Sequence, residues 1–129
     1  MPVIPAGNER IMVVDDEKSL VDIIQTTLEG LGYTVVPCTD AEEALKLFQS
    51  DPDHYDLVIT DLTMPHMTGL ELIQSFFTSR PKLPVILCTG FSELVSEDKA
   101  EALGIQKFLT KPVLRADLAK AVRAALDAD

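Results

Sequence analysis

The chain has 129 residues, of which 21 are Asp or Glu and 11 are Lys or Arg, so its formal net charge is −10. This length suits one domain with a single buried core, and 47% hydrophobic residues exclude a wholly disordered chain. A negative charge without a basic patch excludes general binding to nucleic acid or to anionic membrane surfaces. No apolar run reaches the ~18 residues of a membrane span and no signal peptide is visible, so we expect a cytoplasmic domain without membrane insertion.

The first nine residues contain two of the eight prolines and follow no hydrophobic period. This predicts a flexible lead-in or linker over 1–9 and a folded domain over 10–127. Cys38 and Cys88 each lie in an apolar run and are predicted to be small buried thiols. His54 and His66 lie in polar, turn-like segments and are predicted to be solvated.

Short apolar runs and longer amphipathic segments alternate from residue 10 onward. The runs are rich in Val, Ile, Leu and Phe and predict strands at 11–14, 34–38, 57–60, 85–88 and 107–109. Each run is continuous rather than alternating, as expected for parallel strands that are covered on both faces.

The segments after these strands carry apolar residues three and four positions apart, which is the pattern of an amphipathic helix. The predicted helices cover 20–31, 40–48, 72–77, a segment that begins at Ser92, and 114–126. Gly30 and Gly32 mark the end of the first helix. Asp40 is the predicted N-cap of the second helix, with Glu43 as its capping-box partner.

Strand and helix therefore alternate five times, which predicts an α/β fold with a parallel sheet between two layers of helices. Each parallel step needs a right-handed crossover, and a helix supplies it. The pattern alone does not fix the order of the strands in the sheet.

Polar side chains close four of the predicted strands. The first run ends in Asp15 and Asp16, the third in Asp61, the fourth in Thr89, and the fifth shortly before Lys111. Because ligands of open parallel sheets bind outside the carboxyl ends of the strands, these residues predict one shared site at that edge.

Three neighbouring carboxylates oppose one another's ionisation, so such a group needs a cation. Oxygen ligands without His or Cys favour Mg²⁺ or Mn²⁺. Asp15 and Asp16 are adjacent, so we expect one to bind the ion directly and the other to act through water or hydrogen bonds. Asp61 is then a candidate nucleophile toward phosphorus, while Lys111 and Thr89 suit the oxygens of an incoming phosphoryl group.

Four segments in this order carry a family resemblance: IMVVDDE at 11–17, DLTMPHMTG at 61–69, TG at 89–90 and FLTKP at 108–112. Together they resemble the receiver domain of two-component response regulators, over about residues 9–126. The initial segment GNERI at 7–11 and the stretch LCTGFS at 87–92 resemble receivers attached to hybrid sensor histidine kinases.

The resemblance implies a flavodoxin-like doubly wound fold with the strand order 2-1-3-4-5. It implies that Asp61 is the phosphoacceptor and that Asp16 binds Mg²⁺ directly, with Asp15 supporting it. The backbone carbonyl of Thr63 matches the position that completes the metal shell. The bond between Lys111 and its neighbouring proline matches a family cis peptide.

The resemblance also implies a switching mechanism. A phosphohistidine on a histidine kinase or phosphotransfer protein donates its phosphoryl group to Asp61, and hydrolysis of the acyl phosphate resets the domain. The domain would catalyse its own phosphorylation and dephosphorylation, and as an isolated domain it is not expected to be an enzyme in any other sense. Thr89 matches the switch hydroxyl and Lys111 the phosphoryl-binding lysine. The face of the fourth helix, fifth strand and fifth helix would respond, including as a phosphorylation-linked dimer contact. Phe108 stands at the switch-aromatic position without a hydroxyl, so it is either a switch residue or a plain core aromatic.

Three alternatives stay open on the sequence. A Mg²⁺-dependent aspartyl-phosphate phosphatase would have a D-x-D pattern, whereas Asp15 and Asp16 are adjacent. A flavodoxin-like FMN module would have hydroxyls and glycines after the first strand. A receiver that only docks, without phosphorylation, would retain the same fold.

Overall fold

A computed structural model of the protein describes residues 5–90, 101–102, 104–105 and 107–128. Its five strands form one parallel sheet in the order β2-β1-β3-β4-β5. The strands are β1 (Arg10–Val14), β2 (Thr34–Cys38), β3 (Leu57–Asp61), β4 (Val85–Thr89) and β5 (Lys107–Thr110). The predicted α/β fold, and the strand order implied by the resemblance, are confirmed.

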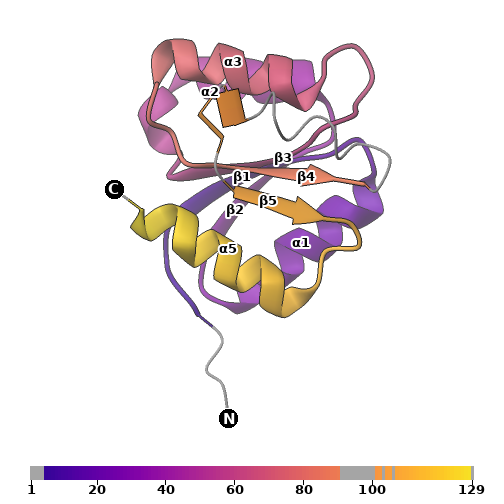
Figure 1. Ribbon diagram of the computed structural model, residues 1–129, viewed down its shortest axis with the longest axis vertical. Helices are drawn as coiled ribbons and strands as arrows, with labels where there is room; N and C mark the ends of the chain where they lie inside the picture. Colours follow the sequence, from indigo (N-terminus) through magenta and orange to yellow (C-terminus); the bar gives the residue numbers. More distant parts are fainter. Residues whose placement is uncertain (1–4, 91–100, 103, 106, 129) are drawn as a thin grey trace.

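Helices cover both faces of this sheet (Figure 1). One face carries α1 (Lys18–Gly30) and α5 (Arg115–Asp127), and the other carries α2 (Ala41–Ser50) and α3 (Gly69–Ser79). A short 3₁₀ helix, η1 (Pro52–His54), precedes β3. The helix predicted after Ser92 falls mostly on residues outside those described.

Alternate residues of the central strands supply the two halves of the core. On β1, Ile11 and Val13 pack with α1 and α5, whereas Met12 and Val14 pack with α2 and α3. All four side chains are at most 1% exposed. Burial of an aliphatic side chain of this size stabilises a fold by about 1.5–3 kcal/mol. The central strands are therefore rigid supports for whatever their carboxyl ends carry.

Three strands extend one residue further than predicted at their carboxyl ends, to Asp61 in β3, Thr89 in β4 and Thr110 in β5. In register, Asp61 lies opposite Cys88, and Thr89 lies opposite Thr110. Polar residues can occupy these last positions because strand pairing uses backbone groups whatever the side chain. The polar side chains thus leave from backbone that the sheet already fixes.

Asp40 is the N-cap of α2, as predicted, but the prediction of Glu43 as its partner is wrong. The Asp40 carboxylate accepts a hydrogen bond from the backbone N–H of Glu42 at 3.3 Å. The reciprocal capping box lies instead at the start of α3. There Thr68 Oγ1 accepts from Glu71 N–H at 3.2 Å, and Glu71 Oε1 accepts from Thr68 N–H at 3.0 Å.

Cys38 and Cys88 are free and buried, as predicted, and burial raises the pKa of each thiol to about 12. Both thiols therefore stay protonated and unreactive near neutral pH. His54 and His66 are exposed, also as predicted. Within the described ranges, no helix combines the length and the apolar character that crossing a membrane requires.

Candidate functional site

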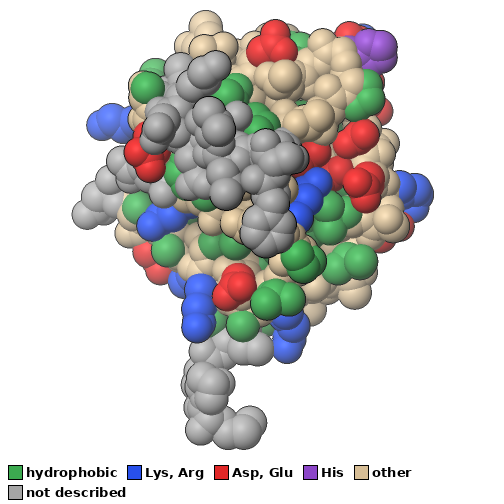
Figure 2. Space-filling view, turned by 45° about the vertical axis from the view of Figure 1, so that its right-hand side comes forward, with side chains coloured by type: hydrophobic (Ala, Val, Ile, Leu, Met, Phe, Trp, Pro, Cys, Tyr) green, Lys and Arg blue, Asp and Glu red, His purple; other side chains and the backbone are tan. Residues whose placement is uncertain are grey.

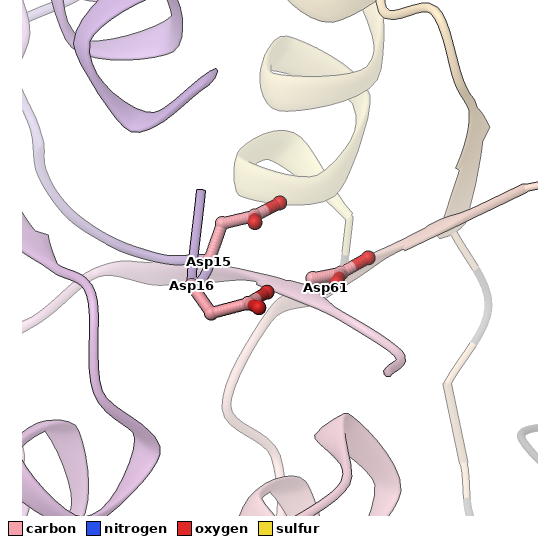
Figure 3. Close-up of side chains that lie close together, drawn as sticks. All are labelled: Asp15, Asp16 and Asp61. Carbon is pink, nitrogen blue, oxygen red and sulfur yellow. The ribbon is translucent and has the colours of Figure 1, made fainter. Parts of the chain in front are cut away.

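The sheet brings three carboxylates together at its carboxyl edge. Asp15 and Asp16 directly follow β1, and Asp61 is the last residue of β3, the strand beside it. One carboxylate oxygen from each residue lies within 4.8 Å of the others. Figure 3 shows the three side chains close together, with those of Asp15 and Asp16 leaving the chain in different directions. Strand order explains the grouping, since β1 and β3 are neighbours in the sheet although they are far apart in sequence.

Asp15 is the more buried of the two adjacent acids, at 3% exposed, whereas Asp16 is exposed. Asp15 Oδ1 accepts a hydrogen bond from the backbone N–H of Glu17 at 2.9 Å, which fixes the direction of the carboxylate. Burial raises the pKa of Asp15, and the Glu17 hydrogen bond and the charge of Lys111 oppose that rise. A cation beside Asp15 would therefore favour its charged form.

Lys111 lies between two of the carboxylates. Its Nζ is 2.8 Å from Asp61 Oδ1 and 3.3 Å from Asp15 Oδ2. Burial alone would lower the pKa of Lys111, but the hydrogen bond with Asp61 and the two negative charges outweigh burial and raise the pKa. Lys111 is thus a permanent positive charge held against the Asp61 carboxylate.

The backbone ties this lysine to the next strand. Lys111 N–H donates to the Thr89 carbonyl at 2.8 Å, and the bond between Lys111 and Pro112 is cis, as the resemblance implies. Thr89 is fully buried, and its hydroxyl oxygen has no hydrogen-bond partner among the described residues. A buried hydroxyl without a partner costs about 1–3 kcal/mol in proteins, which suits a group that bonds to an incoming ligand.

The remaining two predicted site residues, Thr63 and Phe108, differ in their burial. Thr63 is exposed in the segment between β3 and α3, two residues after Asp61. Phe108 in β5 is half-buried and packs against the core cluster formed with α2 and α3. Its ring therefore has a packing role, whatever part it takes in switching.

The donor set of the three carboxylates fits a hard divalent cation. All the ligand atoms are carboxylate oxygens, and no His or Cys belongs to the described group. Such oxygens suit Mg²⁺ or Mn²⁺, whereas zinc prefers nitrogen and sulfur. The burial of Asp15 and Asp61 adds to the fit, because buried acids at this separation need nearby positive charge.

The space-filling view in Figure 2 places charged and hydrophobic side chains side by side on one face of the molecule. Figure 2 shows acidic side chains gathered beside a basic one, with hydrophobic side chains next to them. A cavity of about 310 Å³ lies elsewhere, near the amino ends of β4 and β5, where Leu83, Val85 and Lys107 line it. Of the three acids only Asp16 is exposed, whereas Asp15 and Asp61 are buried.

One contact of the site was not predicted from the sequence. The Glu17 N–H that orients Asp15 is a backbone donor, which any residue but proline would supply. Aspartate often accepts from the backbone two residues further on, so the signal is the presence of Asp15 itself at the turn from β1 into α1.

Comparison with known proteins gives a consistent relationship. A protein-family model described as response regulator receiver domain matches residues 11–123. The alkaline phosphatase synthesis transcriptional regulatory protein PhoP of Bacillus subtilis is 32% identical over 92% of this chain and 49% of its own length. The transcriptional regulatory protein GlrR of Escherichia coli is 32% identical over 91% of this chain and 26% of its own length. The chain thus spans about half, or less, of the curated relatives it matches.

Solved structures agree with these relatives. The crystal structure of a response regulator receiver domain protein from Clostridium thermocellum has a TM-score of 0.88 at 31% identity, covering 92% of this chain and 94% of that one. The chemotaxis protein CheY4 of Vibrio cholerae has a TM-score of 0.85 at 27% identity, covering 93% of this chain and 100% of that one. The likeness therefore covers nearly the whole of this chain.

Proposed function

The chain belongs to the response regulator receiver domains of two-component systems, and from this premise we propose that Asp61 is the phosphoacceptor of a phosphorylation-dependent signalling switch. The observation that carries the proposal is the contact between Lys111 Nζ and Asp61 Oδ1 at 2.8 Å, beside the carboxylates of Asp15 and Asp16. Lys111 places a positive charge directly against the carboxylate that would act as the nucleophile.

The proposed reaction moves a phosphoryl group from a phosphohistidine to Asp61. A bond forms between an Asp61 carboxylate oxygen and phosphorus, while the bond from phosphorus to the imidazole nitrogen breaks and the imidazole leaves with the electron pair. Lys111 is close enough to bind a phosphoryl oxygen without leaving the site. Asp15, Asp16, Asp61 and the Thr63 carbonyl would hold Mg²⁺, which when bound neutralises charge on the phosphoryl oxygens.

Thr89 is the proposed sensor of the new group. Its hydroxyl is fully buried without a described partner, one position beyond the residue that pairs with Asp61. A phosphoryl oxygen on Asp61 would satisfy that hydroxyl, so phosphorylation would favour the conformation in which the two groups meet. We expect this conformational change to reach Phe108 and the face that includes β5 and α5. The same face is the proposed contact of a phosphorylation-linked dimer.

The proposed partner is a histidine kinase or a histidine phosphotransfer protein, in the cytoplasm. Two large hydrophobic side chains support a protein-docking surface: Ile23 in α1 is 60% exposed and Leu114 before α5 is 61% exposed. The helices α1 and α5 cover the same face of the sheet (Figure 1). Exposed apolar side chains on this layer of helices are compatible with contact with another protein. The family membership does not favour the phosphatase alternative.

Incubation with acetyl phosphate and Mg²⁺, followed by intact-mass measurement, tests the proposal. We expect the protein to gain one phosphoryl group, and chelation of Mg²⁺ to prevent the gain. Asp61→Asn should gain none, whereas Asp53→Asn, which changes an exposed acid in η1, should behave as the unmodified protein does. No adduct on the unmodified protein, or an equal adduct on Asp61→Asn, would contradict the assignment.

A further inference from the structure

We propose that Thr60 and Gly69 are positioning residues that hold the backbone of Asp61 from two sides. Neither residue belongs to the acidic group or contacts the phosphoryl group, and the inference rests on the proposed role of Asp61. Thr60 acts through a buried hydrogen bond, and Gly69 acts through the absence of a side chain. Both act on the same atom, the carbonyl oxygen of Asp61.

Thr60 follows the three apolar residues that begin β3 and precedes Asp61. It is 0% exposed, and its Oγ1 donates to the Asp61 carbonyl at 3.1 Å. The other buried polar residues in the described ranges, Asp15, Asp61 and Thr89, all belong to the candidate site. Valine has the same shape and an equal or better tendency to form strands, so the strand itself does not require the hydroxyl. The hydrogen bond is what the hydroxyl adds.

Gly69, the first residue of α3, lies against the same carbonyl group. A Cβ at this position would be 2.1 Å from the Asp61 carbonyl oxygen and 3.1 Å from the Leu62 Cα. Gly69 N–H donates to the Leu62 carbonyl at 2.7 Å, which draws the two segments together. Its φ is outside the left-handed region, so close approach rather than backbone freedom is what requires glycine here.

The helix start cannot easily move away to make room. The capping box between Thr68 and Glu71 fixes the first turn of α3 directly beside Gly69. Between β3 and this turn, Met67 N–H donates to the Pro65 carbonyl at 2.8 Å, and His66 has a positive φ of 71°. The segment that carries Thr63 is therefore closed at both ends by contacts near Asp61.

Displacement of the Asp61 backbone would carry directly to its carboxylate, because aspartate has only two side-chain torsions. The carboxylate must keep its contact with Lys111 at 2.8 Å and its place beside Asp15 and Asp16. Reactions of this kind depend on such placement, and a shift of about 1 Å can cost about 100-fold in rate. Thr60 and Gly69 thus set the geometry that Asp61 brings to the phosphoryl donor.

Substitutions at Thr60 separate positioning from stability. Thr60→Val keeps the shape and removes the hydroxyl, and we expect phosphorylation by acetyl phosphate at saturating Mg²⁺ to slow by about 2- to 10-fold, the range that one hydrogen bond is worth. Thr60→Ser keeps the hydroxyl and removes a buried methyl group, so it should lower the melting temperature yet retain the rate. A merely structural role would make rate and melting temperature change together.

Gly69→Ala, compared with Gly30→Ala, tests the second contact. Gly30 ends α1, and a methyl group added to its Cα would have nothing within 4 Å, so its substitution should leave the rate unchanged. Gly69→Ala should slow phosphorylation by about 100-fold and raise the Mg²⁺ concentration for half-maximal rate, because the Thr63 segment moves with it. All rates are measured well below each variant's melting temperature.

The outcomes are distinguishable. Unmodified protein that gains no phosphoryl group contradicts the proposed function itself. Unmodified protein that is phosphorylated, with Thr60→Val as fast as Thr60→Ser and Gly69→Ala as fast as Gly30→Ala, overturns the positioning role alone. Should Gly69→Ala fail to fold, the Thr60 pair decides: a slow Val variant with a fast Ser variant supports the inference, and equal rates overturn it.

Discussion

At the scale of single residues, the candidate site combines buried, negatively charged carboxylates with one positively charged lysine. Asp15 and Asp61 are 3% and 4% exposed, and Lys111 contacts both. One ammonium group cannot neutralise three carboxylates, so the group retains excess negative charge. A divalent cation would remove most of that excess, which makes cation binding and folding stability interdependent.

Mg²⁺ should therefore stabilise the protein. At ten times its dissociation constant, the ion is expected to raise the free energy of unfolding by about 1.4 kcal/mol, since it binds only the folded site. Thermal unfolding with and without MgCl₂ measures the effect. Asp16→Asn should lose most of it, whereas Asp22→Asn, which changes an exposed acid of α1 paired with Lys18, should retain it. Equal stabilisation of both variants would show that the ion binds elsewhere.

Residue types and strand ends were enough to predict which acids meet. Asp15, Asp16 and Asp61 are recognisable because each closes an apolar run, and parallel strands end at one edge. Thr60 and Gly69 are not recognisable in this way. Their contacts with the Asp61 carbonyl depend on where α3 begins relative to β3, which is a tertiary relation with no local pattern.

At the scale of elements, the starts of α2 and α3 show how similar patterns differ in use. Asp40 and Thr68 are each followed three residues later by glutamate, yet only the second pair forms the reciprocal box in the described structure. At Asp40 the carboxylate bonds to the nearer N–H of Glu42 instead. A pattern of caps predicts that a helix begins, but side-chain conformation decides which backbone group is bound.

Thr68→Ala should lower the free energy of unfolding by about 1 kcal/mol, the usual cost of losing an N-cap. Denaturant unfolding measures it. Thr78→Ala is the matched control, because Thr78 lies in the same helix and its exposed hydroxyl donates back to the Gln74 carbonyl without capping the helix. An equal loss in both variants would mean that losing any threonine hydroxyl from this helix, rather than the cap in particular, accounts for the change, since alanine has the better helix propensity.

At the scale of the whole molecule, Arg123 joins the two ends of the domain. Its guanidinium contacts Glu9 Oε2 at 2.6 Å and Asp127 Oδ1 at 2.8 Å, and donates to the Ala6 carbonyl at 3.2 Å. Gly7 lies beside the guanidinium, and a Cβ on Gly7 would be 2.4 Å from Arg123 Nη1. The Gly7 N–H donates to the Leu31 carbonyl at 3.2 Å. Ala6, Gly7 and Glu9 thus contact the folded domain, while the linker role predicted for 1–9 stays a prediction.

Arg123→Gln should lower the free energy of unfolding at pH 7 by about 1 kcal/mol, as partly exposed ion pairs do. The hydrogen bonds from Arg123 lower the pKa of Glu9 and of Asp127 below their ordinary values of 4.5 and 3.8. A carboxyl group whose pKa is lowered in the folded protein stabilises the fold fully when the pH is above its ordinary pKa. This stabilisation is lost as the pH falls through the lowered pKa. The difference between the two proteins should therefore shrink from pH 7 toward pH 3.

Unfolding curves at both pH values measure this difference. Arg115→Gln is the control, because Arg115 is exposed at the start of the same helix, and its loss should be within about 0.5 kcal/mol at either pH. A loss for Arg123→Gln that is equal at pH 7 and pH 3 would show that packing of the long side chain, not its charge, holds the ends together.

The sequence does not predict the contact between Arg123 and Glu9. Arg123 and Glu9 are 114 positions apart, and no periodic pattern relates them. The alternation of strands and helices predicts the layers of the fold, since each element must bury its apolar side. Which charged side chains then meet depends on the strand order. That order places β1 between β2 and β3, and residues near the start of β1 then lie beside α5 (Figure 1).

The most direct test of Asp61 as phosphoacceptor is to locate the modified residue chemically. Protein phosphorylated with acetyl phosphate and Mg²⁺ is treated with borohydride, which reduces an aspartyl phosphate to homoserine, and the peptides are then mapped by mass spectrometry. Homoserine is expected at position 61 and at none of Asp15, Asp16 or Asp56. Homoserine at another aspartate, with position 61 unmodified, would contradict the proposed site.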